Sequence, residues 1–317
     1  MSAFETIALT GILPAIKIEE LDKAVPLAEA LRAGGVNAIE VTVRNEIAFT
    51  AISRIKAAFP DMAVGAGTIL NASLVDRAID SGAEYCVSPG FNPKTVDYCI
   101  GKNMPIVPGC SSVSDIELAA DAGLTTVKFF PAEANGGTAA LKLINGPFPK
   151  LRFIPTGGLS LNNIGDYLKL KCVLACGGSY MAKADTIAAG NWEKITADCR
   201  KAVAVSQGFT LSHVGINHDS SEDAERTARL LCSMFCLDAD VRSKCTFAGS
   251  YVENMNHGIY GEKGHIGFKC NNLDRAVAWF ESRGWRFIEE SKQFNSKGEL
   301  TCVYFADEIA GFAIHIV

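Results

Sequence analysis

The sequence predicts an α/β protein, in which a (β/α)8 TIM barrel is followed by a smaller α+β domain. Up to about residue 205, eight short apolar runs alternate with amphipathic helical stretches. All five histidines lie after Gly208, where a weak internal repeat begins. A chain of 317 residues is long enough for two domains. We therefore expect a barrel over residues 1–207 and a second domain over residues 208–317.

The eight apolar runs are the predicted strands of the barrel, and most of them end in Gly, Pro, Ser or Thr. In chain order they are "IALTGILPAI", "AIEVTVR", "MAVGAGT", "YCVSPG", "PIVPGCS", "TVKFFPAE", "RFIPTGG" and "VLACGGS". The intervening stretches have helical periodicity, as in "KAVPLAEALRAGG" and "SLVDRAIDSGA". Eight βα units within about 200 residues are typical of a compact barrel.

Composition excludes several classes of function. The net charge of -5 leaves no basic surface for a nucleic-acid backbone, so we expect no nucleic-acid partner. The N-terminal residues lack the pattern of a signal peptide, and no apolar run is long enough to cross a membrane. The eleven cysteines are scattered and contain no C-x-x-C pair, which favours reduced thiols. We expect a soluble, cytoplasmic protein.

The first two hundred residues must perform any chemistry without histidine. Alternation along the second run places Glu40 and Arg44 on the face opposite Ile39 and Val41, so both are expected inside the barrel. The same alternation turns Lys128 inward, and Thr68 closes the third run. Active sites of such barrels lie at the carboxyl ends of the strands, where these side chains would meet.

Lys128 lies between apolar neighbours, which is unusual for an ammonium group. Burial favours the neutral amine, which can attack a ketone and form a Schiff base. The alternative is a buried ion pair with Glu40 or Glu133. Arg44 could hold the carboxylate of a 2-keto acid together with Thr68, while Glu40 moves protons. The alternative for Glu40 and Arg44 is a mutual salt bridge.

Two glycine-rich segments, "PTGG" at 155–158 and "CGGS" at 176–179, end the last two predicted strands. In barrels the loops at these two places often bind phosphate, because glycines expose backbone N–H groups. Ordinary tight turns between strand and helix are the alternative.

Six motifs resemble the 2-dehydro-3-deoxy-phosphogluconate aldolases, also called 4-hydroxy-2-oxoglutarate aldolases, over about residues 6–205. In order they are "IEVTVR", "GAGT", "SPG", "VKFFPAEANGG", "PTGG" and "GGS". The resemblance implies a class I aldolase without a cofactor, often a homotrimer, that acts on a 2-keto acid. The implied products are pyruvate with glyceraldehyde 3-phosphate, or pyruvate with glyoxylate from 4-hydroxy-2-oxoglutarate.

The resemblance also implies roles for individual residues. Lys128 would form the Schiff base, with Glu40 as the general acid and base. The substrate-binding residues would be Arg44 and Thr68 for the carboxylate, Phe130 beside the imine, Pro89 and Thr156 along the substrate, and Gly157, Gly158, Gly178 and Ser179 for the phosphate. Thr156 would favour the gluconate substrate over its galactonate epimer.

After Gly208, "HVGI" at His213 recurs as "HIGF" at His265, and a helical stretch follows each. These features resemble the paired βαβββ modules of the vicinal oxygen chelate proteins, which include glyoxalase and bleomycin-resistance proteins. The resemblance implies a divalent metal held by His213, Glu253, His265 and His315. His315 departs from the glutamate usual at its position. The alternative is histidines packed in a sheet without metal, and His218 and His257 are expected at the surface.

An aldolase with an appended oxygen-chelate-like module is the leading hypothesis. One alternative is a barrel that only binds a phosphorylated sugar acid, with the second domain as a sensor or an oligomer contact. Another is a bifunctional enzyme whose second domain has a metal-dependent lyase or isomerase activity.

Overall fold

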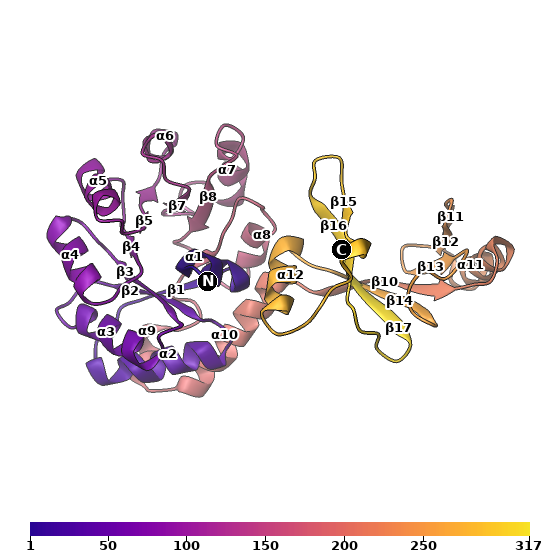
Figure 1. Ribbon diagram of the computed structural model, residues 1–317, viewed down its shortest axis with the longest axis horizontal. Coiled ribbons are helices and arrows are strands. Elements are labelled where there is room, and N and C mark those ends of the chain that lie inside the picture. The colour runs from indigo at the N-terminus through magenta and orange to yellow at the C-terminus, as the bar shows by residue number, and fades with distance from the viewer. The chain divides into compact units, whose positions relative to one another are not determined.

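The computed structural model describes residues 1–317, and the chain divides into two compact units, Met1–Gln207 and Gly208–Val317 (Figure 1). We call them unit 1 and unit 2. No helix in either unit is both long enough and apolar enough to cross a membrane. All eleven cysteines are free thiols, as the reduced-thiol interpretation predicts.

Parallel strands form a ring in unit 1. Their bounds are β1 Ile12–Ile16, β2 Ala38–Thr42, β3 Ala63–Gly67, β4 Tyr85–Val87, β5 Ile106–Val107, β6 Gly109–Cys110, β7 Thr126–Phe129, β8 Arg152–Pro155 and β9 Cys176–Gly178. Hydrogen bonds join them in the orders β5-β4-β3-β2-β1-β9 and β6-β7-β8. Parallel bridges at Phe153–Val173 and Thr156–Gly177 connect β8 to the β9 segment. Because β6 continues the line of β5, the ring has eight positions, and the predicted α/β class is confirmed.

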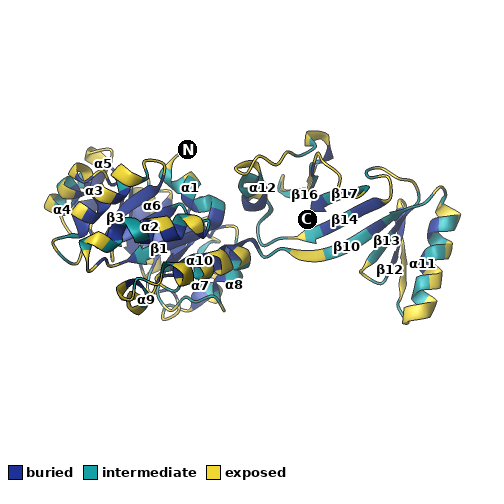
Figure 2. Ribbon diagram, turned by 90° about the horizontal axis from the view of Figure 1, so that it is seen from below, coloured by how far each residue is buried: buried dark blue, intermediate teal, exposed yellow.

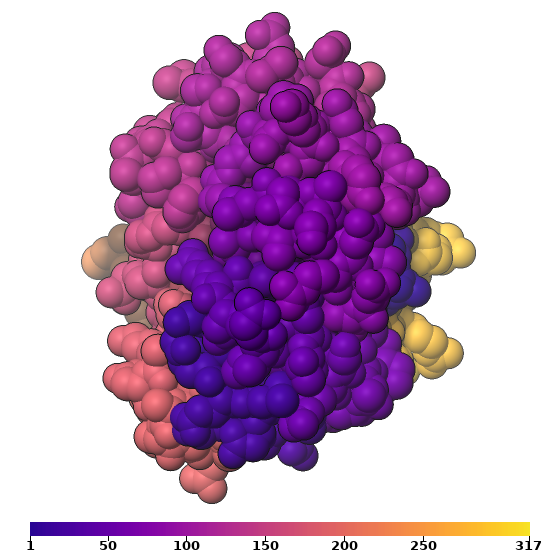
Figure 3. Space-filling view, turned by 90° about the vertical axis from the view of Figure 1, so that its left-hand side faces the viewer, coloured from indigo at the N-terminus to yellow at the C-terminus, as the bar shows by residue number.

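Helices surround this ring. Their bounds are α1 Ala3–Thr10, η1 Leu21–Lys23, α2 Ala24–Ala33, α3 Ala48–Ala58, α4 Ala72–Asp80, α5 Pro93–Gly101, α6 Val113–Asp121, α7 Gly137–Ile144, α8 Ile164–Leu168, α9 Ala184–Ala188 and α10 Trp192–Gln207. The space-filling view looks onto unit 1, and its colours pass around the visible surface in chain order, from indigo through violet and magenta to salmon (Figure 3). The helices bury one face and expose the other (Figure 2). This is the expected amphipathic arrangement.

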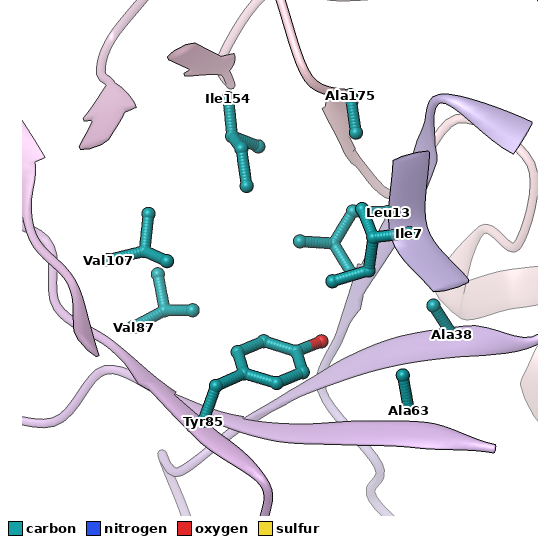
Figure 4. Close-up of a cluster of buried hydrophobic side chains, with 9 residues drawn as sticks. All are labelled: Ile7, Leu13, Ala38, Ala63, Tyr85, Val87, Val107, Ile154 and Ala175. Carbon is teal, nitrogen blue, oxygen red and sulfur yellow. The ribbon is translucent and has the colours of Figure 1, made fainter. Parts of the chain in front are cut away.

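The first predicted strand is wrong over its first four residues, because residues 7–10 belong to helix α1. Ser2 and Glu5 form a capping box at its start, and Gly11 ends it with a φ of 64°. These local signals outweigh the β-prone composition of the run. Ile7 then packs with Leu13, Tyr85 and other side chains from the amino ends of several strands (Figure 4). Helix α1 thus closes the end of the barrel away from the carboxyl ends of the strands.

The fifth predicted strand is interrupted at Pro108, which separates β5 from β6. Proline has no backbone N–H to donate, so the hydrogen-bond ladder breaks there. Its carbonyl oxygen still accepts a hydrogen bond from the Lys128 backbone N–H at 2.9 Å. A Cβ at Gly109 would lie 2.1 Å from the Pro89 carbonyl oxygen, so only glycine permits this close approach.

Unit 2 is a separate mixed sheet with two helices. Its elements are β10 Thr210–Asn217, α11 Ser221–Phe235, β11 Ala239–Val241, β12 Cys245–Ala248, β13 Val252–Met255, β14 Gly264–Lys269, α12 Leu273–Glu281, η2 Glu289–Ser291, β15 Gln293–Phe294, β16 Leu300–Tyr304 and β17 Phe312–Ile316. The strand order is β11-β12-β13-β10-β14-β17-β16-β15. Strands β10 and β14 pair antiparallel at the centre. Each half of the chain here therefore contributes one strand, one helix and then three strands.

Candidate active site

A pocket of about 680 Å³ lies at the carboxyl ends of the strands of unit 1. Every residue of unit 1 for which a catalytic or binding role is expected lines this pocket. They are Glu40, Arg44, Thr68, Pro89, Lys128, Phe130, Thr156, Gly157, Gly158, Gly178 and Ser179. They come from six different strand ends, those of β2, β3, β4, β7, β8 and β9, as expected for a barrel active site.

Lys128 projects from β7 into this pocket and is only 8% exposed. Its neighbours Val127 and Phe129 point to the other side and are fully buried. The Lys128 Nζ atom lies 3.3 Å and 3.4 Å from the two carboxylate oxygens of Glu40. Of the two phenylalanines that follow Lys128, Phe130 lines the pocket beside the amine, with its ring centroid 5.6 Å from Nζ. Of the two expected partners, Glu40 is the one that pairs with the lysine, whereas Glu133 accepts a hydrogen bond from the Tyr167 hydroxyl and is not among the residues that line the pocket.

Glu40 is 2% exposed, and a glycine on the next strand makes room for its carboxylate. A Cβ at Gly67 would lie 2.3 Å from the Glu40 Oε1 atom. Beneath it, the Tyr85 hydroxyl donates to the Ile39 carbonyl oxygen at 2.9 Å. Burial raises the pKa of Tyr85 well above its ordinary value, and the charge of Glu40 adds to this effect. The phenol therefore stays protonated beside the carboxylate.

Arg44 lies beyond the end of β2, in the loop at the mouth of the pocket, and is exposed. The expectation that it is an inward residue of the strand is wrong, because β2 ends at Thr42. Arg44 Nε donates to Thr68 Oγ1 at 3.4 Å, and the salt bridge to Glu40 that was the alternative is not formed. Thr68 has a φ of 63°, which is rare for a β-branched residue and typical of functional sites.

The glycine pair after β8 has a left-handed backbone, with φ of 97° at Gly157 and 80° at Gly158. A Cβ at Gly158 would also lie 2.6 Å from Glu133 Cγ. Thr156 is buried at the start of this turn, and Gly177 on the neighbouring strand leaves space for its hydroxyl. The turn thus brings backbone groups to the pocket where any side chain would be strained.

The sequence interpretation missed three charged side chains that line the same pocket, namely Lys17, Glu19 and Lys183. Lys17 directly follows β1 and pairs with Glu19 at 2.6 Å. Lys183 follows β9, in the same loop as Ser179. Their position after the strands is the signal that could have identified them.

The KDPG and KHG aldolase family matches residues 5–198, where KDPG is 2-dehydro-3-deoxy-6-phosphogluconate and KHG is 4-hydroxy-2-oxoglutarate. The chain belongs to this aldolase family. The KHG/KDPG aldolase of Escherichia coli K12 is 46% identical over 200 residues, which are 63% of this chain and 94% of that protein. The 2-dehydro-3-deoxy-phosphogluconate aldolase of Treponema pallidum is 44% identical over 197 residues, which are 62% and 94%.

Crystal structures of related aldolases superpose on unit 1. The KDPG aldolase of Legionella pneumophila has a TM-score of 0.62 and 37% identity, over 64% of this chain and 98% of that chain. That crystal holds pyruvate as a covalent carbinolamine intermediate. A Zymomonas mobilis aldolase with 3-phosphoglycerate has a TM-score of 0.59 and 38% identity, over 64% and 95%. Unit 1 is therefore a TIM-barrel aldolase of class I, the class that uses a covalent adduct with the substrate.

Unit 2 of this aldolase lies outside the family match, and it gathers three histidines on one face of its sheet. Register places His213 on β10 beside Gly267 on β14, which in turn lies beside His315 on β17. In the next row, Gly215 lies between Glu253 and His265. The register thus brings together the four residues for which a metal-binding role is expected.

The ring nitrogens of these histidines converge. The Nε2 atom of His213 lies 3.2 Å from that of His265 and 3.2 Å from that of His315. A carboxylate oxygen of Glu253 lies 3.1 Å from His265 Nε2 and 3.3 Å from His213 Nε2. A Cβ at Gly267 would lie 2.5 Å from His315 Nε2, so the glycine between the histidines is required.

The electrostatics of the cluster favour a neutral His315 imidazole and an ionised Glu253 carboxylate. Burial lowers the pKa of His315 to about 3, and the two other histidines contribute to the same effect. Burial alone would raise the pKa of Glu253, but hydrogen bonds from His213, His265 and Cys245 outweigh it, so the pKa of Glu253 is lowered. These are the protonation states in which histidine and glutamate bind metals.

Of the two remaining histidines of this aldolase, His257 is exposed as expected. The expectation is wrong for His218, which is partly buried. Its Nε2 atom lies 3.1 Å from Oδ1 of the fully buried Asn254. The polar residues around His218 suggested a loop, whereas strand β13 brings a buried partner to it.

Proposed function

We propose that unit 1 cleaves 2-dehydro-3-deoxy-6-phosphogluconate into pyruvate and glyceraldehyde 3-phosphate, and 4-hydroxy-2-oxoglutarate into pyruvate and glyoxylate. One observation supports this most strongly. A buried lysine amine lies 3.3 Å from a buried carboxylate, in a pocket whose mouth carries Arg44. A nucleophile beside a group that accepts its proton is the arrangement required for covalent catalysis.

The first step needs the neutral amine of Lys128. In the ion pair, Glu40 is close enough to accept the ammonium proton, and this transfer leaves both groups uncharged. Substrate that enters the pocket displaces water, which favours the uncharged pair over the charged one. The amine then attacks the C2 carbonyl carbon to form a carbinolamine. Glu40 returns its proton to the carbinolamine hydroxyl, which leaves as water, so the step gives the iminium ion and restores the Glu40 carboxylate.

The second step breaks the C3–C4 bond. Glu40 in its carboxylate form removes the proton of the C4 hydroxyl, the aldehyde leaves, and the bonding electrons pass into the enamine. Protonation of the enamine at C3 and addition of water at C2 release pyruvate and restore Lys128. The proton and the water that were removed are thereby returned, so the reaction needs no cofactor.

The remaining lining residues would orient the substrate. Arg44 and the Thr68 hydroxyl are adjacent at the mouth and suit the pyruvyl carboxylate. The backbone of the two glycine-rich turns suits the phosphate, with Gly157, Gly158, Gly178 and Ser179 all lining the pocket. Pro89, Phe130 and Thr156 would border the carbon chain, with Thr156 favouring the gluconate epimer over the galactonate one.

A coupled assay tests this proposal. Pyruvate release from each substrate is followed with lactate dehydrogenase, on the intact protein and on Lys128→Met. We expect both substrates to be cleaved by the intact protein and neither by the variant. Tight binding of the phosphorylated acid by a folded protein that releases no pyruvate would instead support the binding-only alternative.

We also propose that the chain assembles as a homotrimer, as the family resemblance implies. Neighbouring helices of unit 1 carry exposed apolar side chains, among them Ile79 on α4, Ile100 on α5 and Leu118 on α6. Such side chains gathered on one part of a surface often mark a protein interface. Light scattering that gives the mass of one chain would contradict this assembly.

For unit 2 we propose a site for a divalent metal made by His213, Glu253, His265 and His315. Donor atoms around a tetrahedral zinc ion are about 3.3 Å apart, close to the separations in this cluster. Three imidazoles with one carboxylate suit zinc or another first-row transition metal better than magnesium or calcium. The order β-α-β-β-β in each half also supports the resemblance to vicinal oxygen chelate modules.

A metal at this site would supply Lewis-acid chemistry. The chain's own contribution is to orient the ligands. Ser212 Oγ lies 3.1 Å from the Nδ1 atom of His213, and Cys302 Sγ lies 3.2 Å from the Nδ1 atom of His315. The Nε2 atom of each of these two rings therefore faces the cluster. Elemental analysis of the full chain after dialysis, compared with His265→Ala, tests the site. Equal metal content in the two proteins would exclude it.

A further inference from the structure

The side chains that line the active-site pocket carry more positive than negative charge. Four cations line it, namely Lys17, Arg44, Lys128 and Lys183, against two carboxylates, Glu19 and Glu40. Lys128 pairs with Glu40 at 3.3 Å, and Lys17 pairs with Glu19 at 2.6 Å. Arg44 and Lys183 are thus left without an ion-pair partner in the pocket.

These two unpaired cations lie at separate places on the rim. Arg44 follows β2 on one side of β1, and Lys183 follows β9 on the other side. Between them the pocket holds the Lys128 amine, which the proposed function places at C2 of the substrate. A substrate with a negative charge at each end would neutralise both cations, with C2 near one end.

Arg44 is adjacent to Thr68, where the carboxylate next to C2 is expected, so Lys183 is left for the distal charge. Lys183 is exposed and four residues beyond Ser179, which belongs to the glycine-rich turn proposed for the phosphate. Resting on that proposed function, we propose that Lys183 binds the distal phosphate and gives the enzyme its preference for phosphorylated over unphosphorylated substrates.

Chemical differences between the two substrates sharpen this inference. The phosphate of the six-carbon substrate carries up to two charges and lies beyond C6, whereas the distal carboxylate of 4-hydroxy-2-oxoglutarate is C5 itself. A lysine at the rim, past the carboxyl end of β9, suits the longer substrate. Because the amine is exposed, salt should screen its attraction for phosphate.

The test compares Lys183→Met and Lys183→Arg with the intact enzyme on both substrates, and Lys94→Met serves as a control on the exposed surface of α5. We expect Lys183→Met to lower kcat/KM for the phosphorylated substrate by about tenfold, mainly through KM, because one charge-assisted hydrogen bond is lost. The value for 4-hydroxy-2-oxoglutarate should change less than about twofold. Lys183→Arg should retain the preference, and Lys94→Met should change neither value.

Inorganic phosphate is a second probe, since it should inhibit the intact enzyme competitively and Lys183→Met about tenfold more weakly. Equal losses on both substrates, or unchanged values for substrate and phosphate, would overturn the assignment. Adduct formation between pyruvate and Lys128 does not involve the distal site. Lys183→Met should therefore still form this adduct. If the intact enzyme itself forms no adduct with pyruvate, the proposed function fails, and this outcome is distinct from failure of the Lys183 assignment.

Discussion

Lys128 Nζ and Glu40 Oε1 lie 3.3 Å apart on β7 and β2, at positions 88 residues apart in the sequence. Both side chains are buried, so their charges are weakly screened by water. The same contact that stabilises the ion pair also gives the amine a proton acceptor. The buried ion pair, which the sequence offered as the alternative to a Schiff-base lysine, is therefore present, and it is also the basis for the proposed chemistry.

Glu40→Gln should separate the two roles of the carboxylate. We expect kcat to fall by about a hundredfold to ten-thousandfold, because the amide cannot accept the C4 hydroxyl proton. Lys128 remains in place, so the variant should still form an adduct with pyruvate, more slowly. Steady-state assays and borohydride trapping measure the two effects, and a variant with unchanged kcat would exclude Glu40 as the base.

Gly67→Ala tests the space beside the carboxylate. The added Cβ would lie 2.3 Å from Glu40 Oε1, so Glu40 must move away from Lys128. We expect kcat to fall and the free energy of unfolding to drop by about 1–3 kcal/mol, as for other overpacked sites. Gly101→Ala, where a Cβ meets nothing within 4 Å, is the matched control. Equal behaviour of the two variants would contradict this view of the site.

Gly267→Ala should disturb the histidine cluster without removing a ligand. Its Cβ would lie 2.5 Å from His315 Nε2 and 2.7 Å from His213 Cε1. We expect at least about a tenfold weaker affinity for zinc, in line with other changes around metal ligands. Competition with a chromogenic chelator measures the affinity, and aldolase activity should stay the same. Unchanged zinc affinity would argue against these nitrogens as the ligands.

Thiol alkylation of the native protein should begin at Cys236, which is exposed. Most other thiols are protected, and burial raises the pKa of Cys110 and of Cys199 to about 12, so little thiolate forms there. Mass spectrometry after brief maleimide treatment should show one fast modification that disappears in Cys236→Ser. Rapid labelling of buried thiols in the folded protein would show that the core is more open than described.

The sequence predicts the barrel well because its strands repeat a local pattern that is independent of distant contacts. Side chains alternate along a strand with a period of two, and this alternation correctly predicted that Glu40 and Lys128 both point into the barrel. It could not show that Arg44 lies past the end of its strand, because strand ends depend on hydrogen bonds to neighbours. Capping at Ser2 likewise outweighed the β-prone residues that follow it.

Other features arise only from tertiary structure. Lys128 pairs with Glu40, whereas Glu133 accepts a hydrogen bond from Tyr167, which is 34 residues away in the sequence. The role of Gly267 between two histidines requires the register of three strands. The position of Lys183 after a predicted strand indicates only that it is near the site, and its lack of an ion-pair partner becomes evident once the charged groups around the pocket are known.

Borohydride trapping with pyruvate tests the central claim most directly. Reduction in the presence of pyruvate should add one pyruvate-derived group to the intact chain, and peptide mapping should locate it on Lys128. Lys128→Met should gain no such group, while Lys94→Met should be labelled as the intact chain is. An adduct on another lysine, or cleavage activity retained by Lys128→Met, would contradict the account.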